Sequence, residues 1–334
     1  MSKVVVISRA GEASMPPTVR HALAVQHDVT FVRRQAAPPA TEAARLLRDA
    51  DVLASTNVTL PRLDGALLDA LPRLRHVVLY ATGYEHIDVA ELDARGITLS
   101  TLPDYATNAV AEHALALLLS SAARVHLAND RARGQVPAEV SLRGVEITSR
   151  TVAVIGLGRI GRRLAQLCHG LGMRVVGVDV DESARRRARQ AGVPVLERDA
   201  ALDEADLVAV CASTMEGLYP VLDRAALARL HEDAFVVNVG RPVLVDSDAV
   251  RSALHTRWLR GYAVDEIVFD PQDPGDDQLL SEGRVLQTAH SAWWRDEVLA
   301  RGAHHFATAI QAAADGAPIH VGSAAHRVLE AVSP

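Results

Sequence analysis

Three glycines in the middle of the chain have the spacing of a phosphate-binding loop. They stand in Gly156-Leu157-Gly158-Arg159-Ile160-Gly161, after the apolar run Thr151–Ile155 and before a helical pattern. In such a loop the first glycine permits a tight turn, the second lets backbone N–H groups approach a pyrophosphate, and the third lets the helix pack closely on the strand. The motif predicts a dinucleotide site that includes Arg159 and Ile160, because a helix N-terminus attracts phosphate.

An aspartate stands where the ribose of such a dinucleotide would lie. Asp179 directly follows the expected strand Arg174–Val178, 18 residues past Gly161. A carboxylate at this point accepts hydrogen bonds from ribose hydroxyls and repels a 2′-phosphate. We therefore expect NAD in preference to NADP. The run Arg185-Arg186-Arg187 could meet a 2′-phosphate, but a solvated helix face is the favoured interpretation.

Two further polar residues follow strands of the same expected sheet and could take part in catalysis beside a bound dinucleotide. Arg241 comes after Phe235–Val239, and His290 comes after Val285–Gln287. The carboxyl ends of parallel strands are where α/β sheets bind ligands. Reduction needs a hydride and a proton for the developing alkoxide, and histidine is a natural proton donor near neutral pH. An arginine fork can bind the substrate carboxylate and carbonyl oxygens.

The order of the motifs resembles the D-isomer-specific 2-hydroxyacid dehydrogenases along nearly the whole chain. This family includes glyoxylate and hydroxypyruvate reductases, phosphoglycerate dehydrogenase and phosphite dehydrogenase. Besides the glycine loop, the resemblance rests on Gly83-Tyr84-Glu85-His86-Ile87-Asp88, Asp104-Tyr105-Ala106-Thr107-Asn108-Ala109-Val110-Ala111-Glu112-His113, Asn238-Val239-Gly240-Arg241, Asp265 with Asp270-Pro271, and Ala289-His290-Ser291-Ala292-Trp293. It implies an NAD-dependent, D-specific enzyme whose catalysis takes place in a cleft between two domains.

The resemblance also assigns roles to individual residues. It implies that Arg241, Asp270 and His290 are catalytic, with Asp270 pairing with the histidine. Substrate would be bound by backbone N–H groups of Thr82 and Gly83, by Tyr105 closing over it, and by Arg241 and Trp293. The cofactor residues would be Gly156, Gly158, Arg159, Ile160, Gly161, Asp179, Val110, Cys211, Val239, Asp265 and His290.

Three departures from the family pattern bear on substrate and rate. Position 270 holds aspartate where glutamate is usual, and Asp270 is shorter by about 1.5 Å. Glu266 and Asp273 are neighbours that could substitute for it, although neither has the usual offset. Pro242 follows Arg241 in place of glycine and removes a backbone N–H. The loop 211–217 lacks the family's usual proline and paired threonines.

The elements expected around these residues are short strands that alternate with helices, which is typical of doubly wound parallel sheets. The expected strands are Val4–Ile7, Val29–Val32, Val52–Ala54, Val77–Tyr80, Thr98–Ser100, Thr151–Ile155, Arg174–Val178, Leu207–Cys211, Phe235–Val239, Gly261–Val264 and Val285–Gln287. Long helices are expected at about Ala106–Val125 and Ala292–Ala314. These elements predict two doubly wound α/β domains. The resemblance implies that a Rossmann NAD-binding domain with the dimerisation helix, 103–289, is inserted into a split flavodoxin-like substrate domain, 1–102 and 290–334.

Composition narrows the class of protein further. The chain has 334 residues, is 49% apolar, and carries 35 Lys and Arg against 41 Asp and Glu, a net charge of −6 that argues against nucleic acid as a partner. Two cysteines, Cys168 and Cys211, suit a reducing cytoplasm. No export or membrane signal is expected, and His304-His305 lacks metal-binding spacing. We expect a cytoplasmic protein that acts on a small molecule, and the resemblance implies that it is a homodimer.

Two other functions stay open at this point. One is oxidation of phosphite or a phosphonate-type substrate at the same site, which the altered loop and acid leave possible. The other is a non-catalytic, NAD-sensing protein that acts as a corepressor. Retention of both His290 and Arg241 weighs against the second.

Overall fold

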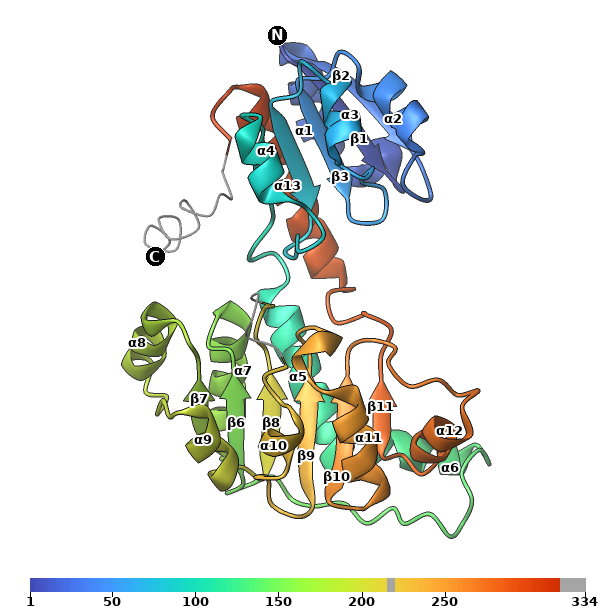
Figure 1. The fold of residues 1–334 in the computed structure, drawn as a ribbon, viewed down its shortest axis with the longest axis vertical. Helices are drawn as coiled ribbons and strands as arrows, with labels where there is room; N and C mark the ends of the chain where they lie inside the picture. The colour runs from blue at the N-terminus through green and yellow to red at the C-terminus, as the bar shows by residue number, and fades with distance from the viewer. Residues whose placement is uncertain (215–219, 319–334) are drawn as a thin grey trace. The chain divides into compact units, whose positions relative to one another are not determined.

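The structure is a computed structural model that describes residues 1–214 and 220–318 (Figure 1). Residues 215–217, part of the atypical loop noted above, lie outside the described residues. The chain divides into two compact units, Met1–Ala106 with the chain from Asp296 onward, and Thr107–Arg295.

The first unit is built on a parallel sheet of five strands, in the order β2-β1-β3-β4-β5. The strands are β1 (Lys3–Ser8), β2 (Asp28–Arg33), β3 (Val52–Thr56), β4 (His76–Tyr80) and β5 (Thr98–Ser100). This is the flavodoxin-like strand order, in which the connections change direction between β1 and β3. The register places Val4 of β1 beside Val29 of β2 and Val52 of β3.

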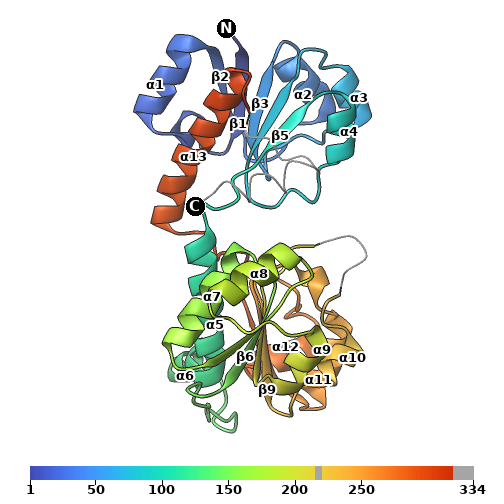
Figure 2. The ribbon, with the colours of Figure 1, turned by 90° about the vertical axis from the view of Figure 1, so that its left-hand side faces the viewer.

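Helices cover both faces of this sheet. Figure 2 shows α1 (Pro17–Gln26) and α13 (Asp296–Ala314) on one face, and α2 (Ala40–Leu47), α3 (Gly65–Asp69) and α4 (Val89–Ala94) on the other. A short 3-10 helix, η1 (Gly11–Ser14), follows β1. Two fully buried side chains of α13, Phe306 and Ile310, anchor it in the core.

The second unit contains a parallel sheet of six strands, in the order β11-β10-β9-β8-β6-β7. The strands are β6 (Thr151–Ile155), β7 (Arg174–Val178), β8 (Leu207–Val210), β9 (Ala234–Asn238), β10 (Leu259–Val264) and β11 (Val285–Gln287). The order reverses beside β6, so the crevice after β6 and β8 is the switch point at which such sheets bind ligands. Two doubly wound parallel sheets confirm the expected fold class.

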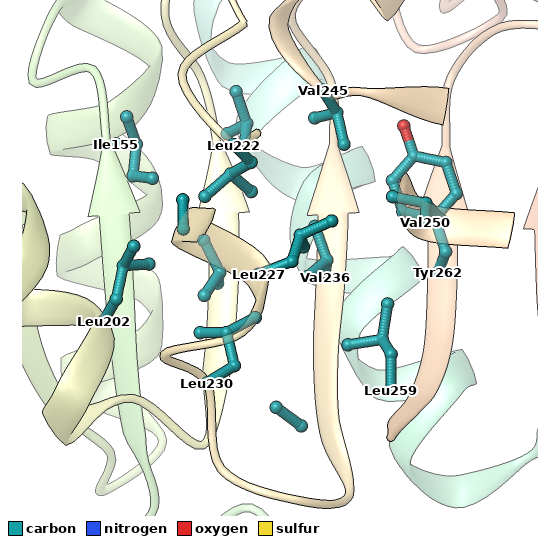
Figure 3. Close-up of a cluster of buried hydrophobic side chains, with 14 of the residues drawn as sticks. Ile155, Leu202, Leu222, Leu227, Leu230, Val236, Val245, Val250, Leu259 and Tyr262 are labelled. Atoms are coloured by element: carbon teal, nitrogen blue, oxygen red, sulfur yellow. The ribbon is translucent and has the colours of Figure 1, made fainter. Parts of the chain in front are cut away.

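The helices of the second unit form two layers, each with its own hydrophobic core. One layer contains α5 (Thr107–Ala123), α7 (Arg159–Gly170) and α8 (Glu182–Gln190). The other contains α9 (Arg198–Glu204), α10 (Arg224–Leu227), α11 (Ser247–His255) and α12 (Pro274–Ser281). Figure 3 shows the second core, where Ile155 and Val236 of the sheet face Leu202 and Leu227 of the helices. A sheet that is apolar on both faces explains why its strands read as continuous apolar runs.

Two expected helices have different ends in the structure. The helix expected to reach Val125 stops at Ala123, because Arg124 has a φ of 56° and a second helix, α6 (Val125–Ala132), begins after it. The last helix begins at Asp296 and not near Ala292. No helix in residues 1–214 and 220–318 combines the length and the apolar character needed to cross a bilayer.

We predict that Leu202→Ala destabilises the second unit by about 2–5 kcal/mol, because this fully buried side chain would leave a cavity between α9 and the sheet. Urea unfolding monitored by circular dichroism measures the change. The matched control is Leu171→Ala, at a leucine that is 41% exposed, and its effect should be under about 1 kcal/mol. Equal effects of the two variants would contradict the core described here.

Candidate active site

The loop between β6 and α7 leaves no room for side chains at two of its three glycines. Gly156 has a φ of +93°, and a Cβ on it would lie 2.5 Å from the backbone of Ala212. A Cβ on Gly161 would collide with the carbonyl oxygen of Gly156. At Gly158, in contrast, a Cβ would meet no atom within 4 Å. The open side of the loop is therefore at the glycine where a pyrophosphate is expected to approach the backbone.

The N-terminus of α7 supplies hydrogen-bond donors to this open side. The helix begins at Arg159, and its N-cap, Gly158, provides no side-chain cap. The backbone N–H groups of the first turn lack partners within the helix, and they suit an anion. Arg159 and Ile160 are both half-buried at this turn. The glycine loop thus joins β6 to α7, as the sequence predicts, and its role in binding phosphate stays a prediction.

Asp179 borders the same loop from the end of β7. Its Oδ2 accepts a hydrogen bond from the backbone N–H of Leu157 at 2.6 Å, and its Oδ1 accepts one from that of Asp181 at 2.9 Å. These two bonds hold the carboxylate beside the glycine loop. Each carboxylate oxygen has a second lone pair, so both can also accept from ribose hydroxyls.

Three apolar residues expected to contact the cofactor lie at or near the same edge of the unit. Cys211 and Val239 directly follow β8 and β9, and their backbone N–H groups donate to Ile155 and Val210, at 2.7 and 3.0 Å. Val110 lies in the first turn of α5 and is half-buried. Burial raises the pKa of the Cys211 thiol to about 12. The thiol therefore stays protonated and contributes an apolar surface, not a nucleophile.

Arg241 follows β9 in a turn that Asn238 stabilises. The buried Asn238 donates from Nδ2 to the carbonyl oxygen of Arg241 at 2.9 Å and accepts from the backbone N–H of Gly240 at 3.0 Å. Pro242 opens the 3-10 helix η2 (Pro242–Leu244), a position where the N–H that proline lacks would have no helical partner. The replacement of glycine by proline thus fits this turn.

The loop that carries His290 is held by one buried carboxylate. Asp265 follows β10, and its two oxygens accept from the backbone N–H groups of Ser291 and Ala292, at 2.9 and 3.0 Å. His290 itself has a φ of 52°, which is uncommon for a residue with a side chain. Its own N–H donates to the carbonyl oxygen of Thr288 at 2.8 Å.

A buried histidine supports this carboxylate from α5. Arg295 donates to Nδ1 of His113 at 3.2 Å, so Nδ1 must accept and the ring proton lies on Nε2. The Nε2–H then donates to the hydroxyl of Thr288 at 3.0 Å, and that hydroxyl donates to Asp265 at 2.6 Å. Burial, together with the charge of Arg295, lowers the pKa of His113, and Asp265 offsets this in part. The neutral ring is the form that the network requires.

The structure pairs His290 with Glu266. Nδ1 of His290 lies 3.0 Å from Oε2 of Glu266, and the two side chains are 52% and 35% exposed. Asp270, the expected partner, uses its carboxylate to accept from the backbone N–H of Gln272 at 2.8 Å. Its backbone N–H donates to Asp276 at 3.0 Å. The expected contact between Asp270 and His290 is therefore not formed in this structure.

The residues expected to bind substrate in the first unit lie around the end of β4. The hydroxyl of Thr82 donates to the carbonyl oxygen of Leu102 at 2.8 Å. The groups expected to bind substrate here are therefore the backbone N–H groups of Thr82 and Gly83. The buried ring of Tyr105 packs edge-on against Tyr80, with centroids 5.5 Å apart. Burial raises the pKa of the Tyr105 phenol well above its usual value, so the group stays neutral.

Trp293 lies in the second unit, close to the His290 loop in sequence. Its ring packs edge-on against Trp294, with centroids 4.9 Å apart, and Trp294 is 59% exposed. The two indoles give the segment between β11 and α13 an aromatic surface. Among the described residues, no group of three His, Cys, Asp or Glu side chains could hold a metal ion.

Sequence reasoning missed the residues that hold the loop after β10 and the loop after β11 in place. Thr288 and Arg295 belong to the His113 network, and Gln287 accepts from the backbone N–H groups of Val268 and Phe269, at 3.1 and 3.0 Å. The sequence does show that polar residues follow both of the strands that become β10 and β11. These residues lie side by side only because the two strands are neighbours, and the sequence does not show that pairing.

Comparison with known proteins identifies the family. Residues 115–292 match the model of the D-isomer specific 2-hydroxyacid dehydrogenase, NAD binding domain. The chain is 33% identical over 263 residues to a glyoxylate reductase of Korarchaeum cryptofilum, covering 77% of each protein. It is 31% identical over 263 residues to a D-3-phosphoglycerate dehydrogenase of Mycobacterium leprae, covering 79% of this chain and 49% of that protein.

This chain belongs to the D-isomer-specific 2-hydroxyacid dehydrogenase family. The match confirms the resemblance seen in the sequence, and with it an NAD-dependent oxidoreductase of this family. A crystal structure of a Thermus thermophilus protein superposes with a TM-score of 0.79 at 26% identity, covering 94% of this chain and 98% of the other. A D-lactate dehydrogenase of Aquifex aeolicus, solved with NAD and lactic acid, shares the fold with a TM-score of 0.76 at 23% identity, covering 94% and 96%.

We predict that Gly158→Ala weakens NADH binding about tenfold or more and leaves the thermal stability unchanged. The added methyl group meets no protein atom but occupies the side of the loop that the pyrophosphate approaches. Fluorescence titration with NADH measures the affinity. The control is Gly170→Ala, at the end of the same helix, where a Cβ also meets no atom within 4 Å. Unchanged affinity in Gly158→Ala would contradict the proposed path of the phosphates.

We also predict that His113 makes the second unit less stable in mild acid. Its pKa is lowered in the folded state, so the unfolded state binds a proton more readily. The stability from the neutral ring is complete above the ordinary histidine pKa and is lost as pH falls below it. His113→Gln keeps a donor near Thr288 but does not titrate, so its melting temperature should fall less between pH 8 and pH 5.5. The control, His169→Gln at an exposed position on α7, should behave as the unaltered protein does; equal slopes for all three would contradict the prediction.

Proposed function

We propose that this protein transfers a hydride between NAD and a 2-hydroxy or 2-keto acid, with specificity for the D configuration of the hydroxy acid and with His290 as the general acid and base. The observation that carries the proposal is the placement of His290. It follows β11 at the carboxyl edge of the sheet whose β6 leads into the glycine loop, and Asp265 holds its loop by two backbone hydrogen bonds. The relatives named glyoxylate reductase make glyoxylate the first substrate to test.

Residues of this chain carry out proton transfer and substrate binding in this reaction. NAD, when bound, supplies the group that accepts or donates the hydride. In the direction of reduction, His290 donates a proton to the alkoxide oxygen that develops on the substrate, and in oxidation it takes that proton back. Arg241 binds the carboxylate and carbonyl oxygens with two parallel N–H bonds. Its turn after β9 is fixed by Asn238, which reduces the entropy lost on binding.

We also propose a role for each of the other residues expected to bind substrate or cofactor. Backbone N–H groups of Thr82 and Gly83 would bind the substrate carboxylate, and Tyr105 can contribute only a neutral phenol. Trp293 would provide an apolar contact for the substrate side chain. Asp179 supports a preference for NAD over NADP, because a 2′-phosphate beside a fixed carboxylate is repelled.

We also propose that the enzyme is a cytoplasmic homodimer joined through α5, with no nucleic-acid partner.

The test is turnover of 2-keto acids with NADH, followed at 340 nm. We expect activity with at least one acid from glyoxylate, pyruvate and hydroxypyruvate, and much less with NADPH. His290→Asn should lower kcat by about 10²–10⁴-fold, because the proton donor is lost. Arg241→Lys should lower kcat/KM by about 10- to 100-fold, since a point charge cannot make the paired bonds. His304→Asn, at an exposed histidine on α13, is the control.

Two results would contradict this assignment. Formation of NADH from NAD and phosphite, with no turnover of any 2-keto acid, would favour an oxyanion substrate. Tight NADH binding with no turnover of either class would favour a non-catalytic NAD-binding protein.

A further inference from the structure

We propose that Glu266, and not Asp270, is the carboxylate that orients the imidazole of His290. The inference rests on the proposed function, because it assigns a positioning residue to the same site. Position 270 is where the resemblance places this acid. The structure shows a different acid in contact with the imidazole.

The register of two strands brings Glu266 to the histidine. In the parallel pair β10 and β11, Val264 lies beside Gln287. Glu266 is two residues beyond the first and His290 three residues beyond the second, so both leave the sheet at the same edge. The backbone N–H of Thr288 donates to the carbonyl oxygen of Val264 at 2.9 Å, which extends the pairing past the strand ends. The contact therefore follows from the sheet and does not depend on a distant loop.

Asp270 lies four residues beyond Glu266 on the loop after β10, and hydrogen bonds to Arg251 and Asp276 hold this part of the loop. Arg251 donates from Nε to the buried Asp276 at 2.8 Å and from Nη2 to the carbonyl oxygen of Val268 at 3.0 Å. Asp276 in turn accepts from the backbone N–H of Asp270 at 3.0 Å, and Arg251 lies 4.9 Å from the ring centre of Phe269. Asp270 is thus fixed at both its backbone and its side chain. To reach His290, it would have to break these bonds.

The hydrogen bond to Glu266 determines which nitrogen of His290 reacts. A carboxylate only accepts, so Nδ1 of His290 carries a proton that it donates to Glu266. The second nitrogen, Nε2, is then the one that gives or takes the catalytic proton. In reduction the Nε2–H bond breaks, an O–H bond forms on the substrate, NADH supplies the hydride, and the ring is left neutral with Nδ1–H still bonded to Glu266. This is the orienting role of the acid in a histidine–carboxylate pair.

The charge of Glu266 acts on the same ring. An opposite charge within hydrogen-bond distance favours the imidazolium, and partial exposure of both side chains weakens the effect through solvent screening. Other charged groups near this loop are Asp265, which accepts from backbone N–H groups, and Arg295 and His113 in its network, while Arg241 follows the neighbouring strand β9. Glu266 is the carboxylate that the structure places directly on the His290 ring.

The experiment compares Glu266→Gln with Asp270→Asn as a matched pair that removes charge and keeps size. In Glu266→Gln, we expect the fall of keto-acid reduction at alkaline pH to begin at lower pH, and kcat/KM at pH 8 to drop about tenfold with unchanged NADH affinity. The amide oxygen can still accept from Nδ1, so this variant isolates the charge. Asp270→Asn should leave the pH profile in place. A purely structural role for Glu266 would lower the melting temperature without moving the profile.

A second measurement does not depend on turnover. Long-range proton–nitrogen NMR spectra report the protonation of each ring nitrogen, and the His290 signals are those missing in His290→Gln. We expect a protonated Nδ1 in the unaltered protein and in Asp270→Asn, and loss of this preference in Glu266→Leu, which cannot accept a hydrogen bond.

The proposal is overturned if Asp270→Asn moves the pH profile or the ring signals and the Glu266 variants do not, or if none of them moves either. If the ring signals respond to Glu266 but no 2-keto acid is turned over, the pairing stands and the proposed function fails.

Discussion

The arrangement of the site depends on one buried carboxylate that binds backbone. Asp265 accepts from the N–H groups of Ser291 and Ala292 and from the hydroxyl of Thr288. These bonds hold His290 in a left-handed conformation that costs of order 1 kcal/mol or more for a residue with a side chain. Such a conformation persists only where its surroundings determine it, and it is typical of functional sites. The loop is thereby held by the protein's own hydrogen bonds.

The network behind Asp265 is consistent in its donors and acceptors from end to end. Arg295 can only donate, which makes Nδ1 of His113 an acceptor and Nε2 a donor. Thr288 accepts from that ring and donates to Asp265. A protonated His113 would have no acceptor for its Nδ1–H and would face a cation. The lowered pKa of His113 and the geometry of the His290 loop are therefore two aspects of the same constraint.

The two sheets share a strand order but differ at their switch points. In the second unit the crevice after β6 and β8 is lined by glycines, and Gly156 lies against the backbone of Ala212. In the first unit the corresponding crevice after β1 and β3 contains buried hydroxyls, since Ser55 and Thr59 both donate to the carbonyl oxygen of Ile7, at 2.9 and 2.8 Å. Sheets of similar topology thus carry different residues at their switch points, glycines in the second unit and buried hydroxyls in the first.

Sequence alone determined the strand pattern, the glycine loop and Asp179, because each of these depends on neighbours within one βαβ segment. It also identified Arg241, Asp265 and His290 as residues at strand ends. It did not decide which acid meets the histidine, since Glu266 and Asp270 follow the same strand. The register of β10 against β11 brings Glu266 to His290, and bonds to Asp276 and Gln272 hold Asp270 in another position. Nor could it show Arg295, His113 and Thr288 in one network, because these residues are up to 182 positions apart. The conformation of a short segment depends on adjacent residues and can be predicted from them. Contacts between side chains of different elements form only when the sheet brings those elements together.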